Sequence, residues 1–178
     1  AEWVSSKEWW YRRQFELPRP FAGKRVFLQF DATDYYADVF VNGERIARHE
    51  GYIDPWEAEI PQHILRSGGN EVLVRVWTPV HYYWKHRPYT IKGAYGAVDQ
   101  KPDDITALGI TRSVRLRAYE EARIADVAVN TRLTESGAAV EMELGADGAG
   151  PGMQWELTLT PANFQGEPLQ LRSPLARR

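Results

Sequence analysis

The stretch Ala37-Asp38-Val39-Phe40-Val41-Asn42-Gly43 decides the fold of this chain. A short run rich in β-branched and aromatic residues meets the dipeptide Asn-Gly, and both residues of that dipeptide tolerate the positive φ that tight hairpin turns require. Residues 44–49 should return as the partner strand. The stretch therefore predicts an antiparallel pair near the middle of the sequence.

Strand patterns continue on both sides of this hairpin. Residues 25–31 alternate apolar and polar side chains, and Phe27 on the polar side predicts a strand covered on both faces for part of its length. Residues 71–78 place Val72, Val74 and Val76 on one face, and residues 10–17 and 110–118 read as further strands. The chain between 61 and 66 looks like one helical turn that begins with a proline. Short strands separated by turns predict an all-β fold, an antiparallel sandwich or jelly roll.

The composition excludes several functions. The 178 residues carry 22 basic and 24 acidic side chains and have a pI near 6.1, so the surplus of Lys and Arg that binds phosphate backbones is missing. We therefore expect no nucleic-acid partner. No apolar run approaches the roughly 20 residues that cross a bilayer, so no membrane partner is expected. The absence of cysteine excludes disulfides and thiolate chemistry.

Composition also divides the chain into two expected domains. Residues 1–118 hold 17 basic and 15 acidic side chains and 19 of the 22 aromatic residues, whereas residues 119–178 hold 5 basic and 9 acidic side chains. The second part offers strands over 124–133, 138–144 and 153–160, with a spacing typical of an immunoglobulin-like β-sandwich. Such a domain needs roughly seven strands, and only about four are visible. Residues 173–178 show no pairing signal, so we expect this domain to be cut short.

Residues 79–109 break the rhythm of the first domain. They combine histidines, tyrosines and a tryptophan with glycines, and they show neither helical nor strand periodicity. Irregular connections longer than about 12–15 residues are uncommon in compact domains and often carry function. This segment is the first place to look for a site.

Several segments in sequence order carry a resemblance to a known family. They are Trp9–Phe15, Gly23–Asp31, Asp34–Gly43, His49–Tyr52, Gly69–Val76 and Gly109–Leu116. Together they resemble the N-terminal region of glycoside hydrolase family 2, the group of β-galactosidases, β-glucuronidases, β-mannosidases and exo-glucosaminidases. Any single fragment could be chance, but the whole series in order is hard to dismiss.

The resemblance implies an order of domains. In that family a jelly-roll, galactose-binding-like sugar-binding domain comes first, an immunoglobulin-like sandwich second, and a TIM barrel with two catalytic glutamates third. Residues 1–118 look like the jelly roll, truncated at its N-terminus, and 119–178 look like the front of the second domain. The barrel would then be a missing partner domain of the same chain, and the carbohydrate substrate a β-glycoside bound by the whole enzyme.

Candidate substrate-binding residues lie in the irregular segment. In the β-galactosidases of the family an acidic residue about this far before the Gly-Ile strand contacts substrate, which by position points to Asp103, with Asp104 beside it. The alternative is an aspartate that caps a turn after Pro102. Tyr83, Trp84 and Tyr95 could stack on sugar rings, or could pack the segment against the barrel.

Other chemistry finds little support. Retaining glycosidases need two carboxyl groups about 5–5.5 Å apart in one pocket. Glu120 and Glu121 are adjacent and would point to opposite faces of a strand, while Glu141 and Glu143 fit the solvated face of one. The four histidines lack the spacing of a zinc site, and no Ser-His-Asp arrangement or phosphate loop is present. We therefore expect no catalytic residue, no metal and no cofactor in this chain.

These observations predict a non-catalytic fragment of a family 2 exo-glycosidase that hydrolyses terminal β-linked sugars. Residues 79–109 would contribute to the rim of the active site. The tyrosines after Asp34 look closer to β-mannosidases than to β-galactosidases, but the sugar stays open. Two alternatives remain, a stand-alone carbohydrate-binding module and a structural pair of β domains of the adhesion type.

Overall fold

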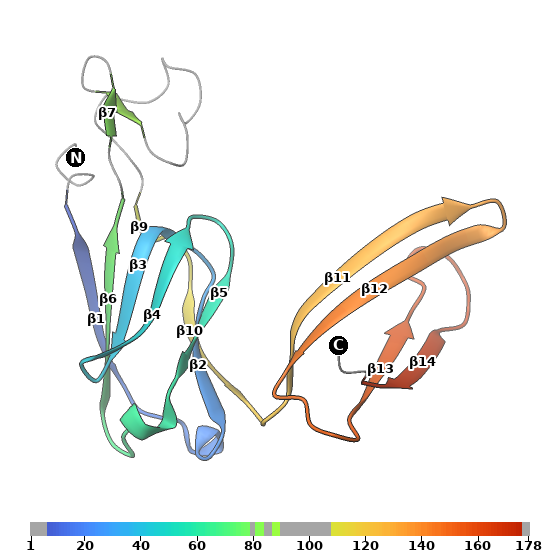
Figure 1. Cartoon of the computed structure of the whole chain (residues 1–178), viewed down its shortest axis with the longest axis horizontal. Coiled ribbons are helices and arrows are strands. Elements are labelled where there is room, and N and C mark those ends of the chain that lie inside the picture. Colours follow the sequence, from blue (N-terminus) through green and yellow to red (C-terminus); the bar gives the residue numbers. More distant parts are fainter. Residues whose placement is uncertain (1–6, 79–80, 84–86, 90–107, 176–178) are drawn as a thin grey trace. The chain divides into compact units, whose positions relative to one another are not determined.

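The computed structural model describes residues 7–78 and 108–175, together with the backbone of 81–83 and 87–89 (Figure 1). The chain divides into two compact units, Ala1–Tyr119 and Glu120–Arg178. The described elements are strands and two short 3₁₀ turns, which confirms the all-β fold class. No helix in this part of the chain is long and apolar enough to cross a membrane.

The first unit is a sandwich of two antiparallel sheets. The larger sheet has the order β1-β6-β3-β4, with β9 paired to the start of β3, and the smaller sheet has the order β10-β2-β5. The strands of the larger sheet are β1 (Trp9–Phe15), β3 (Thr33–Val41), β4 (Glu44–Gly51), β6 (Asn70–Trp77) and β9 (Gly109–Ile110). Those of the smaller sheet are β2 (Arg25–Phe30), β5 (Trp56–Ile60) and β10 (Val114–Tyr119).

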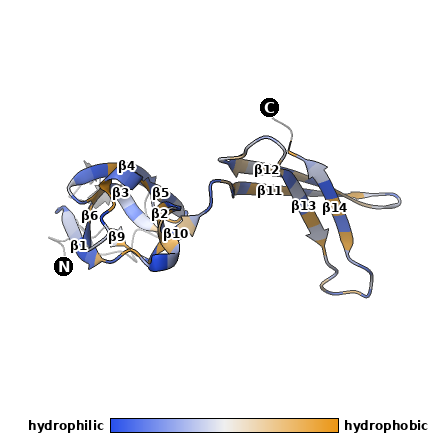
Figure 2. Cartoon of the chain, turned by 90° about the horizontal axis from the view of Figure 1, so that it is seen from below, coloured by the Kyte–Doolittle hydropathy of each residue, from blue (hydrophilic) through white to orange (hydrophobic). Residues whose placement is uncertain are grey.

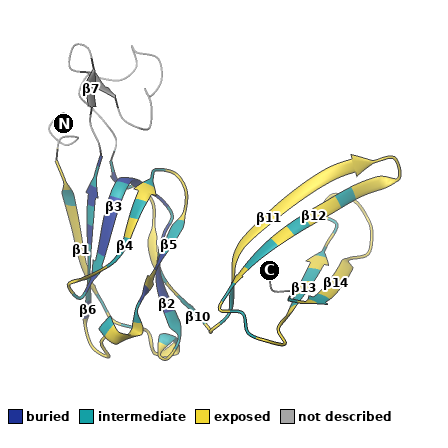
Figure 3. Cartoon of the chain, viewed as in Figure 1, coloured by how far each residue is buried: buried dark blue, intermediate teal, exposed yellow. Residues whose placement is uncertain are grey.

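The core lies between these two sheets. Alternate residues of each strand point inward, which is why the apolar positions recur with a period of two. The buried set is Val26, Leu28, Phe30 and Ile60 from one sheet and Ala37, Val39, Val41, Val74 and Val76 from the other. Figure 3 shows the burial concentrated in β2, β3 and β6. Phe27 on the opposite face of β2 is also buried and packs edge-on against Tyr119, which confirms that this strand is covered on both faces.

Two amide side chains fasten the end of the sandwich that carries the Asn42-Gly43 turn. Asn42 and Gly43 have φ of 51° and 89°, which confirms the predicted hairpin. The Asn42 amide donates to the Ile64 carbonyl at 2.6 Å and to the Asn70 Oδ1 at 2.8 Å. Asn70 is 1% exposed and also bonds the backbone of Arg66 and Gly68.

Both 3₁₀ turns are short. One is η2 (Arg19–Phe21), and the other is η3 (Gln62–Ile64), which follows Pro61 and lies within the single helical turn expected over 61–66.

The second unit consists of two antiparallel hairpins. One pairs β11 (Arg123–Thr134) with β12 (Gly137–Asp147), and the other pairs β13 (Gln154–Leu159) with β14 (Leu169–Pro174). The expectation that residues from 173 onward lack a partner is wrong, because Ser173 and Pro174 pair with β13. The alternation Leu169-Gln170-Leu171-Arg172 already carried that strand's signal.

Each hairpin has one apolar face. Val127 and Val129 lie opposite Leu144 and Met142, and Leu157 lies opposite Leu171 (Figure 2). These faces are poorly covered, since Val129 is 53% and Leu133 is 87% exposed. Among the described residues, each hairpin therefore leaves apolar side chains of one face exposed.

The segment expected to be irregular, 79–109, contains a short hairpin. Its strands are β7 (His81–Tyr83) and β8 (Arg87–Tyr89), and β9 begins at Gly109. The prediction that this stretch has no strand was wrong at those positions. Three-residue strands are too short for a period of two to show in the sequence.

Candidate functional site at the end of the first sandwich

One end of the first sandwich gathers the functional side chains. Strands β1, β3 and β5 begin there and β4 and β6 end there, and the chain between β6 and β9 leaves and returns at the same end (Figure 1). We call it the loop-bearing end. Function commonly resides on loops that a rigid scaffold holds, so the side chains around their base decide how such a loop is presented.

Three stacked rings lead from the core to the loop-bearing end. Trp56 lies between Phe30, at 4.4 Å and 7°, and His49, at 4.3 Å and 4°. Its indole N–H donates to the Thr33 hydroxyl at 2.9 Å, and Thr33 is fully buried. The hydrogen bond and the two ring contacts fix the start of β5 against the start of β3.

His49 ends this stack in a restricted position. Its Nε2 is buried and has no hydrogen-bond partner among the described residues. Burial lowers the pKa of His49, and the carboxylates of Asp54 and Glu50 act in the opposite direction. A side chain at Gly51 would approach this nitrogen to 2.9 Å, so glycine leaves the room that the ring occupies.

The start of β3 supplies a buried carboxyl group and a phenol. Asp34 is 4% exposed, and the peptide bond that joins it to Tyr35 is cis. The Tyr35 hydroxyl donates to the Glu50 carboxylate at 3.1 Å. Burial raises the pKa of Tyr35, and the hydrogen bond to Glu50 adds to the effect, so the phenol stays a neutral donor at ordinary pH.

Aromatic contacts connect Tyr35 to the last residue of β6. Tyr35 packs edge-on against Tyr36 at 5.0 Å, and Tyr36 lies 5.3 Å from Trp77 at a tilt of 34°. The Arg75 guanidinium lies 4.3 Å from the Trp77 ring centroid and that of Arg48 lies 5.4 Å from it. These cation–π contacts hold Trp77, which lies two residues before the start of the 79–109 segment.

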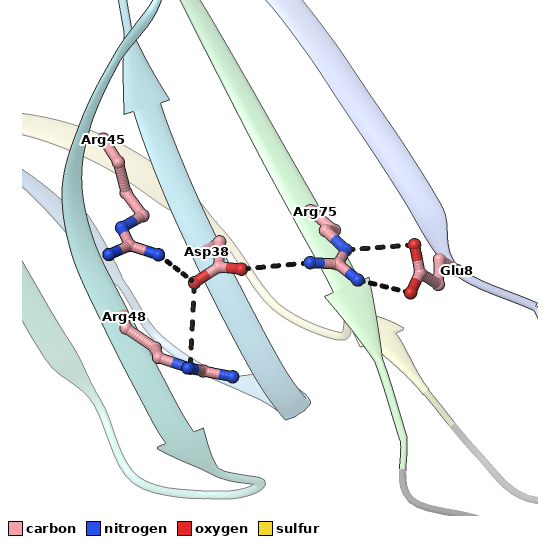
Figure 4. Close-up of polar contacts among 5 residues, drawn as sticks. All are labelled: Glu8, Asp38, Arg45, Arg48 and Arg75. Atoms are coloured by element: carbon pink, nitrogen blue, oxygen red, sulfur yellow. Dashed lines mark hydrogen bonds and ion pairs between the residues drawn. The ribbon is translucent and has the colours of Figure 1, made fainter.

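An ionic network continues from these arginines across the outer face of the larger sheet (Figure 4). Arg75 donates to Glu8 with two nitrogens and to the Asp38 Oδ2 at 3.4 Å. Hydrogen bonding to Arg75 lowers the pKa of Glu8, and the same bond raises that of Arg75. The network ties β1, β6 and β3 together next to the loop-bearing end.

The loop-bearing end brings together carboxylates, a phenol, an imidazole and an indole. Their side chains contact one another and the core: Tyr35 donates to Glu50, and Trp56 donates to Thr33 and stacks on His49. Within the described residues, no group of three or more His, Asp or Glu side chains is placed to hold a metal ion.

The predicted site residues are not part of this description. Asp103, Asp104, Trp84 and Tyr95 lie outside the described residues, and for Tyr83 only the backbone in β7 is described. Whether they approach a substrate stays a prediction.

Two of the carboxylate pairs weighed in the sequence are described. Glu120 and Glu121 are exposed and lie between β10 and β11, outside the strand expected there, and the second pair lies on a polar strand face. Glu141 and Glu143 stand opposite Asn130 and Ala128, on the face of β12 away from Val129 and Met142. Both are exposed. The expectation of a solvated face for this pair is confirmed.

Sequence reasoning missed Trp56, His49 and Thr33 as parts of one site. The dipeptide Asp54-Pro55 marks a turn, and Trp56-Glu57-Ala58-Glu59-Ile60 alternates as a strand should, so the start of β5 could have been found. The stacking of Trp56, the first residue of β5, on His49 could not have been predicted, because this contact depends on the position of the end of β4 in the folded chain.

A β-sandwich of two antiparallel sheets with these strand orders has the architecture of a jelly roll. The glycosyl hydrolase 2 galactose-binding domain-like family matches residues 1–105 of this chain. The chain belongs to that family.

Relatives with known names agree with this assignment. The chain is 30% identical over 118 residues to a β-galactosidase of Thermoanaerobacter pseudethanolicus, covering 66% of this chain and 14% of that protein. It is 27% identical over 154 residues to the β-glucuronidase of Canis lupus familiaris, covering 79% of this chain and 24% of that protein. The chain thus spans a quarter or less of these relatives.

A solved structure shares the fold over nearly the whole chain. The β-D-mannosidase from Dictyoglomus thermophilum superposes with a TM-score of 0.75 over 97% of this chain and 23% of its own, at 23% identity. At that identity the match shows the fold alone.

Proposed function

We propose that this chain is the non-catalytic N-terminal part of a family 2 exo-glycosidase that hydrolyses terminal β-linked sugars. The observation that carries the proposal is the family match over residues 1–105, together with relatives that are named as β-galactosidase and β-glucuronidase. Two catalytic glutamates in a TIM barrel outside residues 1–178 would perform a retaining reaction.

We assign the second unit, 119–178 by sequence, to the front of an immunoglobulin-like spacer. Its two hairpins each carry an apolar face that is about half exposed, as at Val129 and Leu171. Further strands of the same domain would cover these faces. Sheets that bury one face on a partner sheet are the general solution for such a pattern.

We assign the segment 79–109 to the rim of the enzyme's active site. Asp103 would accept hydrogen bonds from sugar hydroxyls, with Asp104 beside it, and Trp84, Tyr83 and Tyr95 would line the approach. The proposal is supported by the base of this segment, where Trp77 is held by two arginines and Gly109 pairs with β3. A rigid base allows a long loop to present side chains reproducibly.

The test compares the chain with the whole gene product on aryl β-glycosides. We expect turnover by the whole protein and none by residues 1–178. In the whole protein Asp103→Asn should lower kcat/KM about 10- to 100-fold, because a lost charge-assisted hydrogen bond costs about 1.5–3 kcal/mol. The matched control, Glu141→Gln on the solvated strand face, should leave kcat/KM unchanged.

Two results would contradict the proposal. Turnover by residues 1–178 alone would place catalysis in this chain. Saturable calorimetric binding of mannose, galactose, glucosamine or glucuronate to the chain, with no barrel encoded downstream, would instead favour a stand-alone carbohydrate-binding module.

A further inference from the structure

The outer face of the larger sheet carries a row of side chains to which the proposed function assigns no ligand, although two of them, Arg48 and Arg75, also contact Trp77. Arg48, Asp38, Arg75 and Trp10 stand opposite one another on β4, β3, β6 and β1. Directly opposed residues share a face, and their neighbour Ala37 points into the core, so all four lie on the outside. The row spans about 14 Å, three strand spacings of about 4.8 Å.

Two arginines of this face are open to a ligand. Arg45 and Arg48 have side chains that are 58% and 62% exposed. The β-bulge between Val39 and Phe40 sets Arg45 opposite Phe40, on the same face as Arg48. Their nitrogens lie 3.9 and 3.8 Å from the Asp38 Oδ1, too far for a hydrogen bond.

The buried carboxylate holds these arginines without using up their donors. Asp38 is 3% exposed, and its Oδ1 has no hydrogen-bond partner among the described residues. Within the ion-paired cluster three arginines face two carboxylates, those of Asp38 and Glu8 (Figure 4). Each exposed guanidinium keeps N–H donors in a planar fork, the geometry that binds carboxylate or sulfate.

An exposed indole lies at the other end of the row. Trp10 is 55% exposed, and its ring stacks on Phe40 at 5.9 Å and 28°, across β6. Contact with Phe40 restrains the ring. A restrained, exposed indole is a platform on which the C–H face of a pyranose can stack.

We propose that this outer face binds an acidic glycan, a chain of uronate or sulfated sugars. One sugar ring stacks on Trp10, and an acidic group further along the glycan is bound by Arg45 and Arg48. The face borders the loop-bearing end at Trp77, and the proposal does not depend on the exo-glycosidase assignment.

The surroundings of Trp10 favour a glycan over an acidic protein. Protein interfaces have a desolvated apolar centre from which charged residues are depleted. Here the ion pairs Arg12–Glu71 and Arg75–Glu8 lie on the strands next to Trp10. The chain as a whole carries a charge of −2, so a polyanion would be attracted by the local cluster and not by the net charge.

The test measures binding of the chain to polygalacturonate by calorimetry and affinity electrophoresis, with uncharged dextran as the neutral polymer. We expect saturable binding to polygalacturonate that weakens as salt is raised, and none to dextran. The double variant Arg45→Gln/Arg48→Gln should weaken binding at least about tenfold, since it removes two charge-assisted contacts. Trp10→Ala should weaken it by a similar factor.

A charge-matched control separates this site from general electrostatics. Arg112→Gln/Arg117→Gln removes the same charge from exposed positions in and just before β10 of the smaller sheet, and should leave affinity within about twofold. Circular dichroism and thermal melts establish that each variant is folded. Absence of saturation, equal weakening by both double variants, or equally tight binding of poly-glutamate would overturn the proposal.

Discussion

The hydrogen bond between Trp56 and Thr33 gives a prediction that can be worked out from the structure. Thr33 is 0% exposed and accepts from the Trp56 indole at 2.9 Å. In Trp56→Phe the phenyl ring keeps the stack between Phe30 and His49 but offers no N–H. The buried hydroxyl then loses its donor, which costs about 1–3 kcal/mol, and the smaller ring adds to that cost.

The reciprocal variant, Thr33→Val, removes the acceptor and keeps the shape of the side chain. The free energy of unfolding should fall by about 1 kcal/mol, because the indole loses its partner. When both partners are replaced by apolar groups, no unpaired polar group remains. The double variant should therefore be more stable than the sum of the single effects predicts, by about 1 kcal/mol.

The assay is urea unfolding followed by tryptophan fluorescence. Trp155 is the one tryptophan of the second unit, so a Trp155→Phe background restricts the signal to the first unit. A control cycle pairs Trp10→Phe with Thr33→Val and should be additive within about 0.5 kcal/mol. Additivity of the Trp56 and Thr33 effects within the same margin would refute the role given to this hydrogen bond.

Three further changes have definite expected outcomes. Asn70→Ala removes four hydrogen bonds and should lower the free energy of unfolding in urea by about 4 kcal/mol. A loss below about 1 kcal/mol would contradict the stabilising role given to the Asn70 side chain. Because the pKa of folded His49 lies below the unfolded value near 6.5, stability should be greatest above that pH and fall below it. His49→Gln should flatten that dependence in melts at several pH values, and a dependence unchanged by this substitution would contradict the role given to burial of His49. Gly109→Ala should lower the free energy of unfolding by about 1 kcal/mol or more, since φ is +126° and the new Cβ would lie 2.7 Å from the Tyr11 hydroxyl oxygen. Urea unfolding in a Tyr11→Phe background should show a smaller loss, and the difference measures the cost of the steric clash apart from that of the backbone conformation.

Local patterns were enough to predict most of the strands. The alternation over 25–31 and 71–78 and the Asn42-Gly43 turn all correspond to observed elements, because one buried face imposes a period of two. Strand β5 was missed although it alternates, since its acidic residues at 57 and 59 resemble a surface loop.

The site could not be predicted to the same extent. Asp38 lies between Ala37 and Val39 and reads as a solvent-facing position of β3. In the structure it is buried, because arginines from β4 and β6 meet over it, and the sequence does not encode that meeting locally. Likewise, the stack of His49 on Trp56 joins residues that no periodicity relates.

The hydrogen bond between the side chains of Asn42 and Asn70 affects how fast Asn42 deamidates during storage of this protein. Asparagine followed by glycine loses its side-chain amide readily. The backbone nitrogen of the glycine attacks the side-chain carbonyl carbon of the asparagine, and glycine has no side chain that hinders this attack. In the folded chain the contacts to Ile64 and Asn70 hold this amide in place. Each opening of the hairpin exposes the Asn42 amide to deamidation. When the hairpin closes again, the resulting carboxylate would face the carbonyl oxygen of Ile64 and the Oδ1 of Asn70. The deamidated fraction at position 42 would thus increase with the number of times the hairpin has opened, and deamidated molecules would refold less readily than unmodified ones.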